Sequence, residues 1–366
     1  MPKNNLPTSL YIHIPFCDHI CSYCDFTKLF YNHEFSSKYL EALNKELCSY
    51  NIGKQKTIYV GGGTPTSLKD DEFDKLLSNI EKYFDSGCEF TLESNVENLT
   101  EQKLQIMESH HVNRLSIGIQ SSNDKRLKEI GRHHSFKEAI QVVEMAKKHQ
   151  FDSINVDLIY GFPNESIDEL KKDLDNILKL DVDHISIYSL IVSPGTVFYN
   201  QKIKEQNQDD SRKYYDLILK TLRDAGYERY EISNFARNKK YSRHNLNYWH
   251  NGEYYGVGLG ASGYIGNTRY TNTKNITKYL SGEYINEKEI INDEMLLEYY
   301  LITNLRLEQG FNRTEFKEVF GVDFAMKFSE KIKVFQKKSQ IIIDNDKIRL
   351  SDDGLMIMDH ILLNIL

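Results

Sequence analysis

Six short apolar segments alternate with six amphipathic stretches over residues 10–226. The apolar segments are rich in Ile, Val, Leu and Tyr, and the stretches between them repeat apolar residues at the helical period. Strands that alternate with helices predict a parallel sheet covered by helices. Six units are fewer than the eight that close a full barrel, so the expected fold class is α/β with a partial, open (β/α)6 barrel. The expected strands are residues 10–16, 57–63, 89–94, 114–120, 153–161 and 184–190.

The rest of the chain has a different character. Residues 227–290 are rich in Tyr, Asn and Gly with few helical patterns, and residues 291–366 combine helical patterns with a hairpin signal. We therefore divide the chain into a barrel (1–226), a middle segment (227–290) and a smaller winged-helix-like α+β domain (291–366). The candidate recognition helix of that domain is mixed in charge, so we expect a docking or lid module and no nucleic-acid partner.

Charge and hydropathy narrow the class of protein. Lys and Arg number 46 against 53 Asp and Glu, a net charge of −7, which argues against a general nucleic-acid binder. The chain has no apolar run long enough for a membrane helix, and its first ten residues lack the features of a secretory signal. We expect a cytoplasmic protein and leave peripheral association with a membrane open.

Three cysteines follow the first expected strand at the spacing C-x3-C-x2-C: Cys17, Cys21 and Cys24. Five cysteines in a chain of 366 residues do not make a disulfide framework. Three interpretations remain open on the spacing alone. The thiols are structural, or they form a zinc site that lacks its usual fourth ligand, or they hold an iron–sulfur cluster and leave one iron open.

The ends of the expected strands carry further polar and glycine residues. In parallel sheets the chemistry lies at the carboxyl ends of the strands. The second expected strand ends in GGGTP, residues 61–65. Glycines let a backbone approach a ligand closely, and we expect exposed N–H and C=O groups there to bond that ligand.

At this point the sequence resembles a known family. The motifs YIHIPFCDHICSYCDF, GGGTPT, SIGIQSSN, GRHH and DLIYGFP resemble the radical S-adenosylmethionine (SAM) superfamily. Within it they look like the branch of the oxygen-independent coproporphyrinogen III oxidases and the HemW-type haem chaperones, over about residues 8–360. The resemblance implies that the three cysteines hold a [4Fe–4S] cluster whose open iron is chelated by SAM.

The resemblance also implies a SAM pocket. Glu93 or Asp157 would accept from ribose hydroxyls, Arg132 would bind the SAM carboxylate, and Ile191 would pack against adenine. The implied lining is Tyr11, Gly62, Gly63, Thr64, Glu93, Gln120, Arg132, Asp157 and Ile191.

Residues 244–249 read HNLNYW and match the H-N-x-x-Y-W motif associated with haem in the chaperone branch. A neutral imidazole can ligate haem iron, and aromatic rings offer flat faces to a porphyrin. Without the resemblance, a loop with a hydrogen-bonded histidine is the plainer interpretation. With it, we expect haem contacts, and His250 is a rival ligand. The expected haem residues are His244, Asn245, Tyr248 and Trp249.

Two departures from the oxidase pattern favour the chaperone. Phe26 stands where the oxidase has a further cysteine, and only sixteen residues precede Cys17. We expect a haem chaperone that binds haem, the cluster and SAM and transfers haem to an acceptor haemoprotein, for which a membrane-bound respiratory enzyme is one candidate. A homodimer, SAM cleavage and enzymatic activity stay open.

The alternative is an oxygen-independent coproporphyrinogen III oxidase, which would use a SAM-derived radical to decarboxylate propionates. A winged-helix regulator that senses haem or redox state is a more distant one. The G-x-G-x-G run at 256–260 lacks a strand–helix context, so we expect a tight loop over the SAM side instead of a dinucleotide site.

Overall fold

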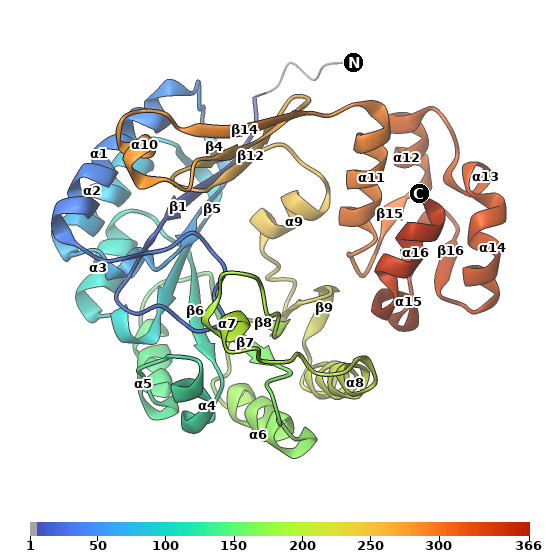
Figure 1. Ribbon diagram of the computed structural model, residues 1–366, viewed down its shortest axis with the longest axis horizontal. Coiled ribbons are helices and arrows are strands. Elements are labelled where there is room, and N and C mark those ends of the chain that lie inside the picture. Colours follow the sequence, from blue (N-terminus) through green and yellow to red (C-terminus); the bar gives the residue numbers. More distant parts are fainter. Residues whose placement is uncertain (1–5) are drawn as a thin grey trace.

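The computed structural model describes residues 6–366, with the backbone alone at 208–210. Within these residues the largest part is one nine-stranded sheet of order β11-β1-β4-β5-β6-β7-β8-β10-β9, flanked by helices (Figure 1). The strands from β11 to β8 pair in parallel. The predicted α/β partial barrel of six units is therefore confirmed. Its strands are β1 (Ser9–Ile14), β4 (Gln55–Gly62), β5 (Phe84–Asn95), β6 (Arg114–Gln120), β7 (Ser153–Tyr160) and β8 (His184–Ser189).

The helices between these strands cover one face of the sheet and bury its apolar side chains. Several begin at side-chain caps that the sequence carries: Ser135 and Ser166 each form a capping box with the glutamate three residues later. No helix in the part of the chain that the structure describes is long and apolar enough to cross a membrane. The covering helices are α1 (His33–Ser49), α2 (Asp70–Glu81), α3 (Glu101–Ser109), α4 (Asp124–Glu129), α5 (Phe136–Ala146), α6 (Ile167–Leu178) and α8 (Gln208–Asp224).

The inner face of the barrel is polar. In β6, Leu115, Ile117 and Ile119 are fully buried in the core, whereas Ser116 and Gln120 line a cavity inside the barrel. The other parallel strands alternate in the same way, because successive side chains of a strand point to opposite faces. The apolar face stabilises the fold, and the polar face is left for a ligand.

Both edges of the sheet carry strands that the sequence did not indicate. On one edge β10 (Asn234–Ala236) and β9 (Glu228–Glu231) pair antiparallel after β8. On the other, β11 (Tyr255–Val257) lies parallel to β1. The expectation of a tight loop over the SAM side at 256–260 is wrong for Gly256 and Val257, which belong to this strand. A turn does follow them, and Gly258 at φ +110° passes so close to the His13 carbonyl that a Cβ there would lie 2.5 Å from its oxygen.

The middle segment brings a short helix into the concave side of the sheet. This helix, α9 (Arg243–Trp249), carries the HNLNYW motif and lies between the barrel and the C-terminal domain (Figure 1). The segment then forms β12 (Ser262–Ile265), β13 (Thr268–Asn272) and β14 (Ile285–Ile290), an antiparallel sheet with α10 (Ile276–Leu280) between its last two strands.

The C-terminal domain has a core of its own, rich in phenylalanine. Its helices and hairpin occur in the predicted order, and its three strands form an antiparallel sheet of order β15-β17-β16. The smaller α+β domain is therefore confirmed. Its elements are α11 (Asp293–Asn304), β15 (Phe311–Asn312), α12 (Arg313–Phe320), α13 (Phe324–Lys327), α14 (Ser329–Lys337), β16 (Ile341–Asp344), β17 (Lys347–Leu350), α15 (Asp352–Met356) and α16 (Met358–Ile365).

Candidate functional site

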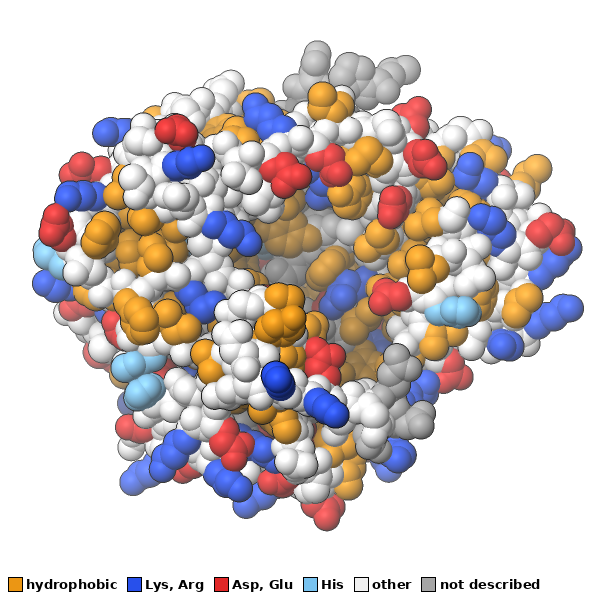
Figure 2. Space-filling model, in the orientation of Figure 1, with side chains coloured by type: hydrophobic (Ala, Val, Ile, Leu, Met, Phe, Trp, Pro, Cys, Tyr) orange, Lys and Arg blue, Asp and Glu red, His pale blue; other side chains and the backbone are white. Residues whose placement is uncertain are grey.

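A cavity of about 390 Å³ opens inside the barrel at the carboxyl ends of its strands. Figure 2 shows the hollow between the barrel and the C-terminal domain on this face of the molecule. The cavity brings together twelve of the residues expected to bind the cluster, SAM or haem. They are Cys17, Cys21, Cys24, Gly62, Gly63, Thr64, Glu93, Gln120, Arg132, Asp157, Ile191 and Asn245.

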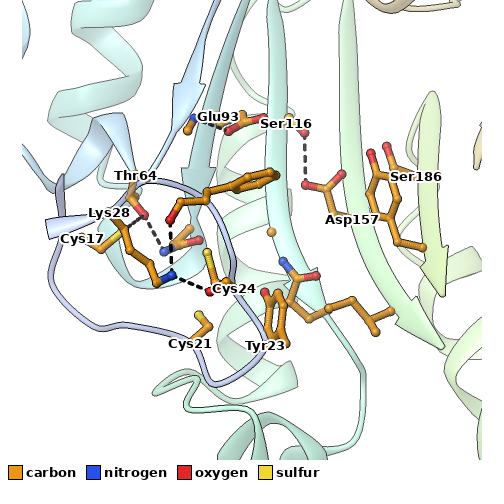
Figure 3. A pocket seen from close by; sticks show the side chains of 18 of the residues that line it. Cys17, Cys21, Tyr23, Cys24, Lys28, Thr64, Glu93, Ser116, Asp157 and Ser186 are labelled. Atoms are coloured by element: carbon orange, nitrogen blue, oxygen red, sulfur yellow. Dashed lines mark hydrogen bonds between the residues drawn. The ribbon is translucent and has the colours of Figure 1, made fainter. Parts of the chain in front are cut away.

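The three cysteines lie on a loop that is anchored at both ends. Cys17 ends β2 (Phe16–Cys17), which pairs with β3 (Leu29–Phe30) where the loop returns. Within the loop, the Lys28 ammonium donates to the carbonyls of Cys24 and Phe26. This arrangement presents all three thiols to one side of the cavity (Figure 3).

The chemistry of these donors fits an iron–sulfur cluster. All three cysteines are free thiols, and burial raises the pKa of Cys17 to about 11. Iron binding would replace those protons, because the thiolate is the form that ligates metals. Among the described residues, no three Cys, His, Asp or Glu side chains meet around a point that would hold a single ion. The thiolates of a cubane bind separate irons and need no such meeting point.

The glycine-rich turn after β4 packs against the cysteine loop. The Gly63 N–H donates to the Ile14 carbonyl (2.8 Å) and the Thr64 N–H donates to the Phe16 carbonyl (2.7 Å). A Cβ on Gly63 would lie 2.8 Å from the Ile14 oxygen. The Gly62 N–H donates to the Glu93 carboxylate (3.0 Å). The expectation that these N–H groups are exposed to a ligand is therefore wrong, since all three donate hydrogen bonds to other groups of the protein.

Two half-buried carboxylates, Glu93 and Asp157, lie across the cavity from each other on β5 and β7 (Figure 3). Glu93 accepts from the Tyr59 hydroxyl (2.5 Å), and Asp157 accepts from the Asn155 amide (2.7 Å). Burial raises the pKa of each, and Coulomb repulsion from Asp157 raises the pKa of Glu93 further. Both acids lie where they can accept hydrogen bonds from hydroxyls of a ligand.

Arg132 and Gln120 lie close together near the cysteine loop. Arg132 is 7% exposed, and its Nη2 donates to the Tyr23 hydroxyl (3.2 Å), while Nε and Nη1 have no hydrogen-bond partner in the described structure. Gly118 makes room for both side chains, because a Cβ there would lie 2.8 Å from Gln120 Nε2 and 3.0 Å from Arg132 Nη2. At the mouth of the cavity Ile191 is 65% exposed.

Four expected residues do not line the cavity: Tyr11, His244, Tyr248 and Trp249. Tyr11 is held beside His13, whose Nδ1 lies 2.9 Å from the Tyr11 hydroxyl. Trp249 is the last residue of α9. The Arg306 guanidinium lies 4.6 Å from the centroid of the Trp249 ring, so Trp249 contacts the C-terminal domain. Of the HNLNYW residues named above, only Asn245 lines the cavity.

His244 is completely buried, and both its ring nitrogens are engaged. Nδ1 lies 2.8 Å from the Thr57 hydroxyl, and Nε2 lies 2.7 Å from the Tyr248 hydroxyl. Thr57 donates its own proton to Ser9, so the proton between Thr57 and His244 is on Nδ1. Nε2 therefore accepts from Tyr248, and iron ligation would require this bond to break.

Several cavity residues were missed by the sequence reasoning. The signal for them was the period-2 alternation of the strands, which placed polar residues opposite the apolar ones on the inner face. The residues in question are Arg114, Ser116, Asn155, Ser186 and Tyr188.

Comparisons with known proteins agree with this architecture. The chain matches the radical SAM superfamily model over residues 11–177 and the HemN C-terminal domain model over residues 291–357. The heme chaperone HemW of Lactococcus lactis subsp. lactis is 35% identical, covering 97% of this chain and 96% of that protein. The heme chaperone HemW of Bacillus subtilis is 36% identical, covering 96% of this chain and 97% of that protein.

A solved structure shares the fold across both domains. The coproporphyrinogen III oxidase (HemN) of Escherichia coli has a TM-score of 0.87 and 21% identity, covering 98% of this chain and 90% of that one. At this identity the likeness concerns the fold, whereas the curated relatives decide the family. The chain belongs to the HemW family of the radical SAM superfamily.

Proposed function

We propose that this protein is a haem chaperone that binds haem together with a [4Fe–4S] cluster and SAM and transfers haem to an acceptor haemoprotein. The observation that carries the proposal is the similarity to proteins described as heme chaperone HemW over nearly the whole chain. Phe26, which stands where the oxidase pattern has a cysteine, favours the chaperone over the oxidase.

Cys17, Cys21 and Cys24 would hold the cluster, and its open iron would supply a coordination site for SAM. Arg132 would bind a carboxylate of SAM through the nitrogens that have no partner in the described structure. Glu93 and Asp157 would accept from the ribose hydroxyls, and Ile191 would cover the adenine at the mouth. The other proposed SAM contacts are Tyr11, Gly62, Gly63, Thr64 and Gln120, with the glycines acting through their carbonyls and shape.

The HNLNYW helix would contact haem on the side of the cavity that faces the C-terminal domain. His244 stays a prediction as the iron ligand, with Tyr248 as the group that must release it. His250 is exposed at the end of α9 and needs no such rearrangement. A Tyr248→Phe variant keeps the ring and removes the competing hydroxyl. Its effect on haem binding is therefore expected to differ according to whether His244 or His250 is the ligand.

The test uses anaerobically reconstituted full-length protein and two readouts: haem uptake by Soret absorbance, and turnover of coproporphyrinogen III with SAM. A haem chaperone takes up haem, passes it to apo-haemoprotein and shows no turnover. If His244 ligates iron, His244→Ala weakens haem uptake and Tyr248→Phe strengthens it, while His250→Ala leaves haem uptake unchanged. Turnover of coproporphyrinogen without haem uptake would overturn the proposal in favour of the oxidase.

A further inference from the structure

The floor of the cavity holds a buried cation that the proposed SAM and haem contacts do not use. Arg114 begins β6, lines the cavity and is 3% exposed. Gln120 is six positions further along, at the other end of the strand, which is about 20 Å at the usual rise of a strand. The side-chain nitrogens of Gln120 and Arg132 lie beside Gly118, four positions along β6 from Arg114, or about 13 Å at that rise. Arg114 is therefore set apart from the cysteine end of the cavity.

The side chain of Arg114 has no direct partner among the described residues. Over residues 6–366 its guanidinium makes no ion pair or side-chain hydrogen bond, and Nε is buried without a partner. An arginine stays charged in a protein, and a buried charge without hydrogen bonds is costly. Glu93 and Asp157 feel its charge, since Arg114 lowers the pKa of both against the larger effect of burial, but neither contacts it.

The neighbours of Arg114 have unpartnered groups as well. Thr91 pairs with Arg114 across β5 and β6, and Ser153 pairs with it across β6 and β7. The hydroxyl oxygens of Thr91 and Ser153 are buried and have no hydrogen-bond partner in the described chain. Orphan polar atoms on three adjacent strands call for an explanation, and a polar ligand or water is the usual one.

Asn245 lines the same cavity from α9. Its backbone N–H donates to the Ser242 hydroxyl, which caps the helix, whereas its side-chain amide has no partner among the described residues. The cavity is therefore lined by the planar fork of a guanidinium and by the two donors of an amide. Such a donor set matches a carboxylate, which accepts two parallel hydrogen bonds from arginine.

We propose that Arg114 and Asn245 bind a carboxylate group of a ligand that enters the cavity. The inference rests on the proposed function, because its two ligands both carry carboxylates: haem through its propionates and SAM through its methionine moiety. The SAM carboxylate would lie at the cluster, beside Arg132. The distance along β6 therefore favours a porphyrin propionate at Arg114.

The experiment compares each ligand with a form that lacks the carboxylate. Reconstituted full-length protein is titrated with haem and with haem dimethyl ester by Soret absorbance, and with SAM and decarboxylated SAM by calorimetry. Wild-type protein should bind haem about 10- to 100-fold more tightly than its ester, as expected for a charge-assisted pair. Arg114→Gln should lose that preference by weakening haem alone, and Arg114→Lys should keep part of it.

Two further variants make the result specific. Asn245→Ala removes a cavity-lining amide without opening the core and should weaken haem but not its ester, which keeps the test valid if Arg114→Gln does not fold. Arg132→Gln is the matched control. It should reduce the preference for SAM over decarboxylated SAM and leave the preference for haem over its ester unchanged. If Arg114→Gln instead loses the preference for SAM over decarboxylated SAM, the carboxylate that Arg114 binds is that of SAM.

The negative outcomes are distinct from one another. If the Arg114 and Asn245 variants keep every preference of the wild type, the carboxylate site is overturned, and Arg114 is only a counter-charge for Glu93 and Asp157. If wild-type protein binds neither haem nor SAM, the proposed function itself fails.

Discussion

Glu89 fixes the HNLNYW helix to the barrel, and its removal should loosen that helix. Glu89 lies on β5, is 8% exposed, and accepts from the backbone N–H groups of Arg243 (2.8 Å) and His244 (2.9 Å). These are first-turn donors of α9, which no helical carbonyl satisfies. The only side-chain cap that α9 carries itself is Ser242, which satisfies a different N–H, that of Asn245.

The cost of removing Glu89 follows mainly from these two bonds, because the third, from the Ser242 hydroxyl, is long at 3.5 Å. Hydrogen bonds to a charged acceptor are worth about 1.5–3 kcal/mol each, and partial access of water to Arg243 reduces the sum. We expect Glu89→Ala to lower the free energy of unfolding of this region by about 2–4 kcal/mol. Glu89→Gln keeps one acceptor oxygen and should lose about half as much.

The chain carries its own reporter for this experiment. Trp249 is the single tryptophan and ends α9, so its fluorescence during urea denaturation follows the helix directly. Far-UV circular dichroism follows the barrel in the same samples. The reasoning predicts a lower midpoint for Trp249 fluorescence in both variants, with Ala below Gln. Midpoints equal to those of wild type, or an equal loss in the two variants, would refute the role of the carboxylate.

Three more predictions concern the turn after β4, a buried histidine and the domain junction. Gly62→Ala should cost about 1–3 kcal/mol and reduce the iron retained after reconstitution, because φ is +108° and a Cβ would lie 2.3 Å from the His13 ring. Gly87→Ala, at φ +80° with open space around it, is the control for thermal melting and should keep all its iron. Burial lowers the pKa of His13 to about 4, below the unfolded value of about 6.5, so the unfolded state binds more protons between these values. The free energy of unfolding of the wild type should therefore fall as pH drops from about 6.5 to 4, by about 1.4 kcal/mol per pH unit for this group. In His13→Gln the free energy of unfolding, measured by denaturation at several pH values, should depend less steeply on pH. An unchanged slope would contradict the low pKa of His13. Arg306→Ala should cost about 2–4 kcal/mol and shift Trp249 emission, because it leaves the fully buried Glu231 without its cation (Nε to Oε2, 2.6 Å); unchanged emission would argue against the contact.

The sequence predicted the parts of the fold that repeat. Strands of β-branched residues alternate with capped, periodic helices, and each of the six expected strands overlaps an observed one. The edge strands β9, β10 and β11 escaped because they are three or four residues long and draw their stability from pairing with a formed sheet. A short segment of this kind carries too little pattern to identify it.

The candidate site divides along the same line. Cysteine spacing and strand ends indicated residues that line one cavity, because both depend on local order along the chain. Two hydrogen bonds could not be anticipated: that between the Tyr248 hydroxyl and Nε2 of His244, and that from the Gly63 N–H to the Ile14 carbonyl. These partners depend on how α9 and the cysteine loop dock against the sheet, which is a property of tertiary packing.

The most direct test of the account is the electron paramagnetic resonance spectrum of the reduced, anaerobically reconstituted protein with and without SAM. Three thiolates that leave one iron open predict a [4Fe–4S]⁺ signal that changes when SAM binds and that is lost in a Cys17→Ser, Cys21→Ser, Cys24→Ser triple variant. Absence of a cluster signal from wild-type protein, or a signal that SAM leaves unchanged, would contradict the account.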